Sequence, residues 1–265
     1  MPEGRPQIVL APLPRCAVLV DRHVHKNGGS TMRAIFAEND YRDGWMYWGY
    51  GLDHLPQLAR SLTAALDMGG NGTACASWDA WARRPPLRLA AELHYGNTYP
   101  GLRNGMLRHV GPSSALARAA LRCNCKMVLV TRVREPLSYY ISFWRWAKIA
   151  LKQRQNASIY GATMIEWATT YRNLQSTLIL GQANLALGPE YVGVRTPRAQ
   201  EIARDFHGFE EPAARPAGVR GPTEGLEGRA RVEQLRRSLR AFDVVGPLER
   251  FEETLLLISG ARPEI

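Results

Sequence analysis

A lysine, two glycines and two hydroxyl residues follow a short apolar run, in the order Lys26-Asn-Gly-Gly-Ser-Thr31. Glycines let a backbone approach a ligand closely. If a helix begins at Ser30 or Thr31, its first amide groups have no intrahelical acceptor. These amides, the positive helix end and the two hydroxyls favour a bound anion, and Lys26 adds a full positive charge. The stretch therefore predicts a phosphate-binding loop between a strand and a helix.

The residue order separates this loop from two common nucleotide-binding loops. In a Walker loop the lysine follows the glycines, whereas Lys26 precedes Gly28 and Gly29. The spacing of the Rossmann fingerprint, G-x-G-x-x-G, is also missing here. On the loop alone, an ordinary glycine turn beside a surface lysine stays open as the other interpretation.

A second strand-loop-helix arrangement carries an arginine, a proline and a serine. The apolar run Met127–Thr131 is typical of a buried strand, and Arg134 and Pro136 follow it closely. Proline suits the first turn of a helix, and Ser142 lies two turns along that helix. A guanidinium group binds phosphate with two hydrogen bonds. Arg134 and Ser142 are therefore candidates for a second phosphate contact.

Both loops resemble motifs of carbohydrate sulfotransferases that use 3′-phosphoadenosine 5′-phosphosulfate (PAPS), of the Golgi heparan and uronyl 2-O-sulfotransferase type. The stretch His23–Thr31 is similar to the family loop H-x-P-K-T-G-G-T-[ST], which grips the 5′-phosphosulfate. Arg134-Glu-Pro136 and Ser142 are similar to R-[DN]-P-x-x-R-x-x-S, which binds the 3′-phosphate. The resemblance implies that PAPS, or its product adenosine 3′,5′-bisphosphate, is bound by Lys26, Asn27, Gly28, Gly29, Ser30, Thr31, Arg134 and Ser142.

The chain departs from the two family patterns at several positions. His25 stands where the family has proline, and Asn27 where it has threonine. Glu135 replaces aspartate or asparagine, and Tyr139 occupies the place of the second arginine. The amide of Asn27 can still donate a hydrogen bond, but Tyr139 brings no positive charge.

Two later stretches extend the resemblance, which runs from about residue 17 to residue 258 and is weakest from 40 to 120. Asn173–Gly181 is similar to the family pattern N-x-Q-[ST]-x-x-L-x-G. Phe242–Leu256 is similar to F-x-x-V-G-x-x-E-x-[FY]-x-x-[ST]-L near the end of the domain.

Transfer of a sulfuryl group requires a base for the acceptor hydroxyl and a positive charge at the oxygen of the leaving phosphate. Lys26 suits the second role. For the base we choose His94, because histidine titrates near neutral pH and the family places its base between the two cofactor motifs. Glu92 is the competing base, and His54 and His109 are weaker candidates.

Composition limits the partners of the chain. A formal net charge of +10 attracts anions. The resemblance implies that the acceptor is a hydroxyl group on a glycan. The positive charge of the protein is compatible with an acidic glycan. Nucleic acid is not an expected partner. No metal site is expected, and the four cysteines predict free thiols or one disulfide. We find no apolar run long enough to span a membrane and no signal peptide. Location in the Golgi lumen therefore rests on the resemblance alone, and a soluble intracellular protein is the alternative.

Apolar strands that alternate with helices predict an α/β class with a central, mainly parallel sheet flanked by helices. The resemblance implies a three-layer, P-loop-like form. We expect one domain over 1–265, with an irregular segment at 1–15 and a mobile loop at 210–228. A nucleotide-dependent kinase and a non-enzymatic polyanion-binding protein are the alternative functions. The expected strands are Ala17–Val20, Leu87–Leu93 and Met127–Thr131, and the expected helices are Ser30–Glu38, Leu55–Leu66, Pro112–Arg122, Pro136–Gln153, Ile165–Leu180, Thr196–Phe206, Arg229–Phe242 and Leu248–Ser259.

Overall fold

Five parallel strands form one sheet in the order β2-β3-β1-β4-β5 in the computed structural model. The structure describes residues 15–51, 55–67, 87–93, 102, 105–153, 163–165, 168, 174–180 and 229–260. The strands are β1 (Cys16–Arg22), β2 (Met46–Gly51), β3 (Leu87–Leu93), β4 (Lys126–Val133) and β5 (Val244–Pro247).

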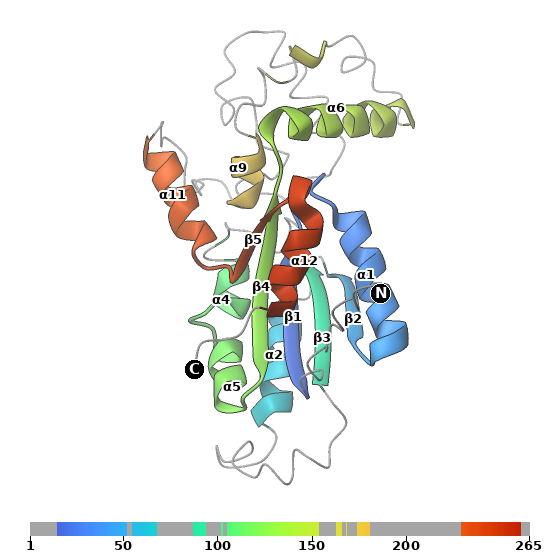
Figure 1. Ribbon diagram of the computed structural model, residues 1–265. Helices are drawn as coiled ribbons and strands as arrows, with labels where there is room; N and C mark the ends of the chain where they lie inside the picture. Colours follow the sequence, from blue (N-terminus) through green and yellow to red (C-terminus); the bar gives the residue numbers. More distant parts are fainter. Residues whose placement is uncertain are drawn as a thin grey trace, which may run out of the picture.

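The central strands are apolar along nearly their whole length because both faces of the sheet are covered by helices. One face packs against α2 (Leu55–Asp67), α4 (Met106–Val110) and α5 (Ala115–Arg122). The other face packs against α1 (Gly29–Asp43) and α12 (Phe251–Gly260). Figure 1 shows α1 and α12 in front of the sheet and α2 behind it. The predicted α/β class, with a parallel sheet flanked by helices, is confirmed.

The connections change direction at β1. From β1 the chain crosses to β2 at one edge and returns through β3, and it then continues to β4 on the other side of β1. Open parallel sheets bind ligands beyond the carboxyl ends of the strands at such a switch point. The topology therefore points to the loop that follows β1.

Helix α6 (Pro136–Gln153) lies across the carboxyl end of the sheet, where β4 leads into it (Figure 1). Helix α9 (Leu174–Ile179) and helix α11 (Arg229–Leu239) lie to one side of the strands (Figure 1). A short 3-10 turn, η3 (Leu248–Arg250), joins β5 to α12.

Several expected boundaries are wrong. Helix α1 begins at Gly29 with Gly28 as its N-cap, so neither Ser30 nor Thr31 caps it. The helix expected over Pro112–Arg122 begins at Ala115, because the Ser114 side chain accepts a hydrogen bond from the backbone amide of Ala117 at 3.0 Å.

Other expectations from the sequence lie outside the described residues. These are the segments at 1–14, 196–206 and 210–228, together with His54 and His94.

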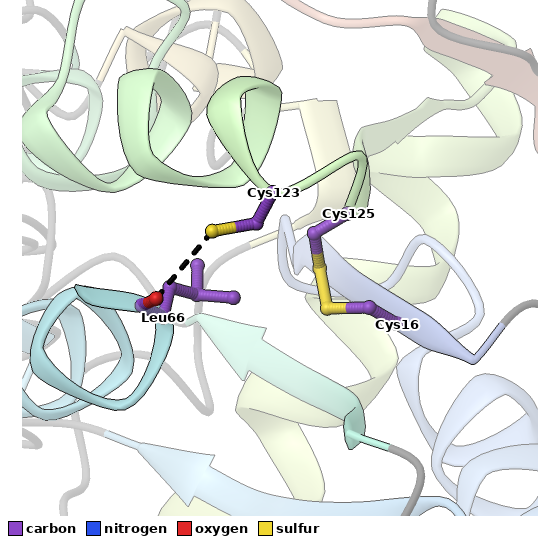
Figure 2. The surroundings of a disulfide bond; sticks show 4 residues. All are labelled: Cys16, Leu66, Cys123 and Cys125. Atoms are coloured by element: carbon purple, nitrogen blue, oxygen red, sulfur yellow. Dashed lines mark hydrogen bonds between the residues drawn. A yellow bond between two sulfur atoms is a disulfide. The ribbon is translucent and has the colours of Figure 1, made fainter. Parts of the chain in front are cut away.

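A disulfide joins Cys16 at the start of β1 to Cys125 just before β4. Figure 2 shows this bond beside Cys123, whose sulfur lies 3.4 Å from the carbonyl oxygen of Leu66. Cys123 is disulfide-bonded as well. The sequence leaves free thiols or one disulfide open, and free thiols are wrong for these three buried cysteines. A single disulfide is wrong as well, because Cys123 is bonded in addition to the Cys16–Cys125 bond.

Across the described part of the chain, none of the helices combines the length and the apolar character needed to cross a membrane.

Candidate functional site

The loop after β1 adopts an unusual backbone conformation. Lys26 has φ +64° and Gly28 has φ +77°, both in the left-handed region. A side chain with a Cβ rarely adopts this region, and such residues gather at functional sites. The loop ends at Gly28, where α1 begins without a side-chain cap. Within the described part of the chain, no side chain caps the first turn of α1, as an anion site requires.

Ser30 and Thr31 lie in the first turn of α1, and both are exposed. Their hydroxyls therefore face solvent at the end of the helix that carries the positive pole of the dipole. This position is compatible with the ligand-binding role that the resemblance implies for them.

The two glycines of the loop are also required by close packing within the protein. A Cβ on Gly28 would lie 2.6 Å from a methyl group of Leu248, and a Cβ on Gly29 would lie 2.2 Å from the imidazole ring of His23. We expected the glycines to admit a ligand. The structure adds a second reason, since the backbone of Gly29 lies against a buried histidine.

We expect Gly29→Ala to lower the free energy of unfolding by roughly 1–3 kcal/mol, because the added methyl group overpacks against the His23 ring. Urea denaturation measures this difference. The matched control is Gly260→Ala, whose Cβ meets nothing within 4 Å. Equal stability of the two variants would contradict the contact.

Reciprocal hydrogen bonds hold the loop after β1 to the end of β4. The side-chain Nδ2 of Asn27 donates to the backbone carbonyl oxygen of Arg132 at 2.7 Å. In return, Arg132 Nε donates to the backbone carbonyl oxygen of Asn27 at 2.8 Å. Arg132 also forms a buried ion pair with Asp21, at 2.7 Å. The side-chain donor of Asn27 is thus used within the protein, where it holds the loop after β1 to the end of β4.

Gln175 of α9 connects both loops. Its side-chain oxygen accepts hydrogen bonds from the side-chain Nδ2 of Asn27 at 3.0 Å and from the backbone amide of Arg134 at 2.7 Å. Its side-chain nitrogen donates to the carbonyl oxygen of Arg134 at 2.8 Å. The sequence marked the stretch around Gln175 by resemblance, and the structure supplies its role as a bridge.

The segment Phe242–Leu256 contacts the same two loops. The Glu249 carboxylate accepts from the backbone amide of Glu135 at 3.1 Å and lies 4.0 Å from Arg134 Nε. Phe251 lies under the Arg132 guanidinium, with 5.8 Å between the guanidinium carbon and the ring centroid. Four stretches that are far apart in the sequence therefore meet around one loop.

A pocket of about 420 Å³ opens beside two of these stretches, with Lys26 of the loop after β1 and residues 134–146 in its lining. Its volume lies in the range of small-ligand sites. Three residues expected from the sequence, Lys26, Arg134 and Ser142, line it together. Trp146, which also lines the pocket, belongs to an aromatic stripe for which the sequence allows both a core role and stacking on a ligand ring. The sequence does not indicate the other three lining residues as ligand-binding, and these are Ser138, Ile141 and Arg145.

The described lining of the pocket has three cations and no carboxylate. Arg134 Nη1 donates to the carbonyl oxygen of Lys26 at 3.2 Å, which brings the two cationic residues together. Burial, and then the charge of Arg134, lower the pKa of Lys26. Lys26 Nζ lies 5.9 Å from the centroid of the Trp146 ring. Like charges this close favour the binding of an anion between them.

The histidines of the loop are buried beneath it. Burial is the main cause that lowers the pKa of His23 to about 2 and the pKa of His25 to about 3. Both imidazoles are therefore neutral at physiological pH. The His25 ring lies 6.0 Å from Phe143 and 5.7 Å from Trp146, between ring centroids. His25 thus fills the apolar space under the loop.

Glu92, the last residue but one of β3, is a buried carboxylate with several partners. Arg33 of α1 donates to both of its oxygens, at 3.0 and 2.9 Å, and the Tyr47 hydroxyl donates to it at 3.2 Å. Glu92 is not part of the pocket lining described above. His94, the preferred base, lies outside the described residues. It follows Leu93, whose carbonyl oxygen accepts from the backbone amide of His23 at 2.9 Å.

Among the residues that the structure describes, no group of three or more histidine, cysteine, aspartate or glutamate side chains could hold a metal ion. Comparisons with protein-family models, with curated proteins and with solved structures give no match for this chain.

Proposed function

We propose that this protein is a sulfotransferase that moves a sulfuryl group from PAPS to an acceptor hydroxyl. The observation that carries the proposal is that two motif-like stretches line one pocket, while two others hold the loops of that pocket in place. Lys26 and Arg134 line that pocket together, and Gln175 and Glu249 brace the loops behind them. A P-loop-like identity of the sheet is part of the same proposal.

The pocket fits a bisphosphate nucleotide in charge and in hydrogen-bonding groups. Its cations have no carboxylate among the described lining residues. The first turn of α1 is not part of that lining, but it begins three residues after Lys26, and in the proposal its backbone donors reach the ligand from beside the pocket. In the proposed arrangement, Lys26 and the first turn of α1 bind the 5′-phosphosulfate. Arg134 and Ser142 bind the 3′-phosphate. When bound, PAPS supplies the sulfuryl group to be transferred.

In the proposed transfer, His94 takes the proton of the acceptor hydroxyl while Lys26 neutralises the phosphate oxygen that leaves. Glu92 remains the competing base, but its two oxygens already accept hydrogen bonds from Arg33. A carboxylate engaged in this way suits a structural partner of Arg33 better than a proton acceptor. This comparison favours His94.

The proposed acceptor is a glycan hydroxyl. The net charge of +10 supports an acceptor that carries negative charge. The test for the acceptor is a panel of neutral and acidic glycans with labelled donor, read as labelled product.

A thermal-shift comparison tests the cofactor. We expect adenosine 3′,5′-bisphosphate at about 100 times its Kd to stabilise the protein by about 2.7 kcal/mol, which raises Tm by about 5–10 °C. ATP with magnesium serves as the second ligand and heparin as the third. Stabilisation by ATP with magnesium alone would favour a kinase, and stabilisation by heparin alone would favour a polyanion-binding protein; either result rejects the proposal.

A further inference from the structure

The pocket carries a second guanidinium that none of the sequence motifs marks. Arg145 lines it together with Arg134, and Ser138 adds a hydroxyl beside Ser142. The inference below rests on the proposed function, because it concerns how that pocket selects its nucleotide.

Helical spacing explains why Arg145 reaches the pocket. An α-helix turns by about 100° per residue, so residues three or four apart share a face. Ser138, Ser142 and Arg145 are separated by four and then three positions, and all three line the pocket. This face of α6 carries two hydroxyls and one positive charge, and Arg134 precedes it in the loop.

The neighbouring face of α6 is occupied by the core. Tyr139 and Phe143 are fully buried, and their rings lie 5.8 Å apart between centroids. Tyr139 is one position from Ser138, about 100° around the helix. A side chain at position 139 therefore packs inward, and a cation of α6 reaches the pocket from position 145 instead.

Arg145 is exposed and available for a ligand. Within the described part of the chain it has no hydrogen bond or ion pair, whereas Arg134 lies 4.0 Å from the Glu249 carboxylate. Two guanidinium groups that flank two serine hydroxyls match a phosphate monoester, which has three terminal oxygens and up to two negative charges.

We infer that Arg145 and Arg134 together bind the 3′-phosphate of the nucleotide, so that Arg145 selects a 3′,5′-bisphosphate over a 5′-monophosphate. The guanidinium of Arg145 replaces the positive charge that Tyr139 does not provide. Ser138 and Ser142 donate hydroxyl hydrogen bonds to the same phosphate.

Isothermal titration calorimetry with two nucleotides tests this role. For Arg145→Ala we expect the affinity for adenosine 3′,5′-bisphosphate to fall about ten- to hundred-fold. The affinity for adenosine 5′-monophosphate should stay within about threefold. Arg145→Lys keeps the charge without the planar fork, so its loss should be intermediate. The matched control is Arg240→Ala, which removes one exposed arginine outside the pocket lining.

The outcomes separate this inference from the proposed function. If the wild-type protein does not bind the bisphosphate, the proposed function fails, and the role of Arg145 fails with it. If wild type and Arg145→Ala bind the bisphosphate equally, only the role of Arg145 is overturned. An equal loss of affinity for both nucleotides, or an equal loss in Arg240→Ala, also overturns it. Circular dichroism and the unliganded Tm show whether each variant is folded.

Discussion

Replacement of Lys26 by methionine is expected to lower sulfuryl transfer by a factor of about 10²–10³. Methionine keeps an aliphatic side chain against Trp146 but removes the charge at the phosphate oxygen that leaves. The lowered pKa of Lys26 reflects burial and the nearby charge of Arg134, and a bound anion relieves both effects. Single-turnover transfer from labelled PAPS to the best acceptor of the glycan panel measures the loss.

The same substitution at the far end of the sheet is the matched control for Lys26. Lys126 begins β4, at the end opposite to the pocket, and Lys126→Met removes an equal charge. We expect its transfer rate to stay within about threefold of wild type. A rate for Lys26→Met that equals the control rate would exclude Lys26 from the transfer step, although the pocket would still bind an anion.

The central strands are predictable from the sequence because strands covered on both faces are continuous apolar runs. The runs at 17–20, 87–93 and 127–131 each became a strand of the sheet. Strands β2 and β5 are not among the expected strands, because the sequence around β2 is broken by glycine and indicates a loop or an edge. Strand β5 has no clear local pattern. It is only four residues long, contains Gly246 and Pro247, and owes its conformation to pairing with β4. A Cβ on Gly246 would lie 2.1 Å from Thr254 Oγ1, so tertiary packing selects glycine there.

The site is only partly predictable for a similar reason. Residue types and spacing indicate Lys26, Arg134 and Ser142, because a phosphate loop has a local pattern. The bridging role of Gln175 depends on contacts across the fold, which no local pattern contains. The position of Arg145 is predictable from helical spacing, since Arg145 lies three positions after Ser142 on a predicted helix. The resemblance drew attention to position 139 instead.

The second large effect concerns the free energy of unfolding, which should fall when the Cys16–Cys125 disulfide is removed. Cys16 and Cys125 are 109 residues apart, and both are buried. A cross-link of this length restricts the unfolded chain strongly, so its removal should cost about 4–5 kcal/mol by the chain-entropy estimate. Urea unfolding of Cys16→Ala, Cys125→Ala and the double variant measures the cost. Reductant is unsuitable as the main test, because Cys123 is disulfide-bonded as well.

The three variants also give an internal control, since either single substitution already breaks the bond. The second substitution should therefore add only a small cavity term, and the two effects should be far from additive. Additive losses would mean that the two cysteines act only as separate buried side chains. The amino ends of β1 and β4 are joined here, whereas their carboxyl ends carry the loops with Lys26 and Arg134. The loops that carry Lys26 and Arg134 should therefore be held less firmly in the double variant.

The free energy that the disulfide contributes predicts in which kind of compartment the protein folds. A domain is typically stable by about 5–15 kcal/mol, so the disulfide supplies a large share of the margin. Disulfides persist in oxidising compartments and are rare in the cytosol. We therefore expect expression in an oxidising compartment to yield protein that binds adenosine 3′,5′-bisphosphate, and expression in a reducing cytosol to yield mostly unfolded chain. The double variant should be recovered from the oxidising compartment as folded protein, but in lower yield than wild type. Equal recovery of wild type and double variant from both would show that the fold does not depend on this bond.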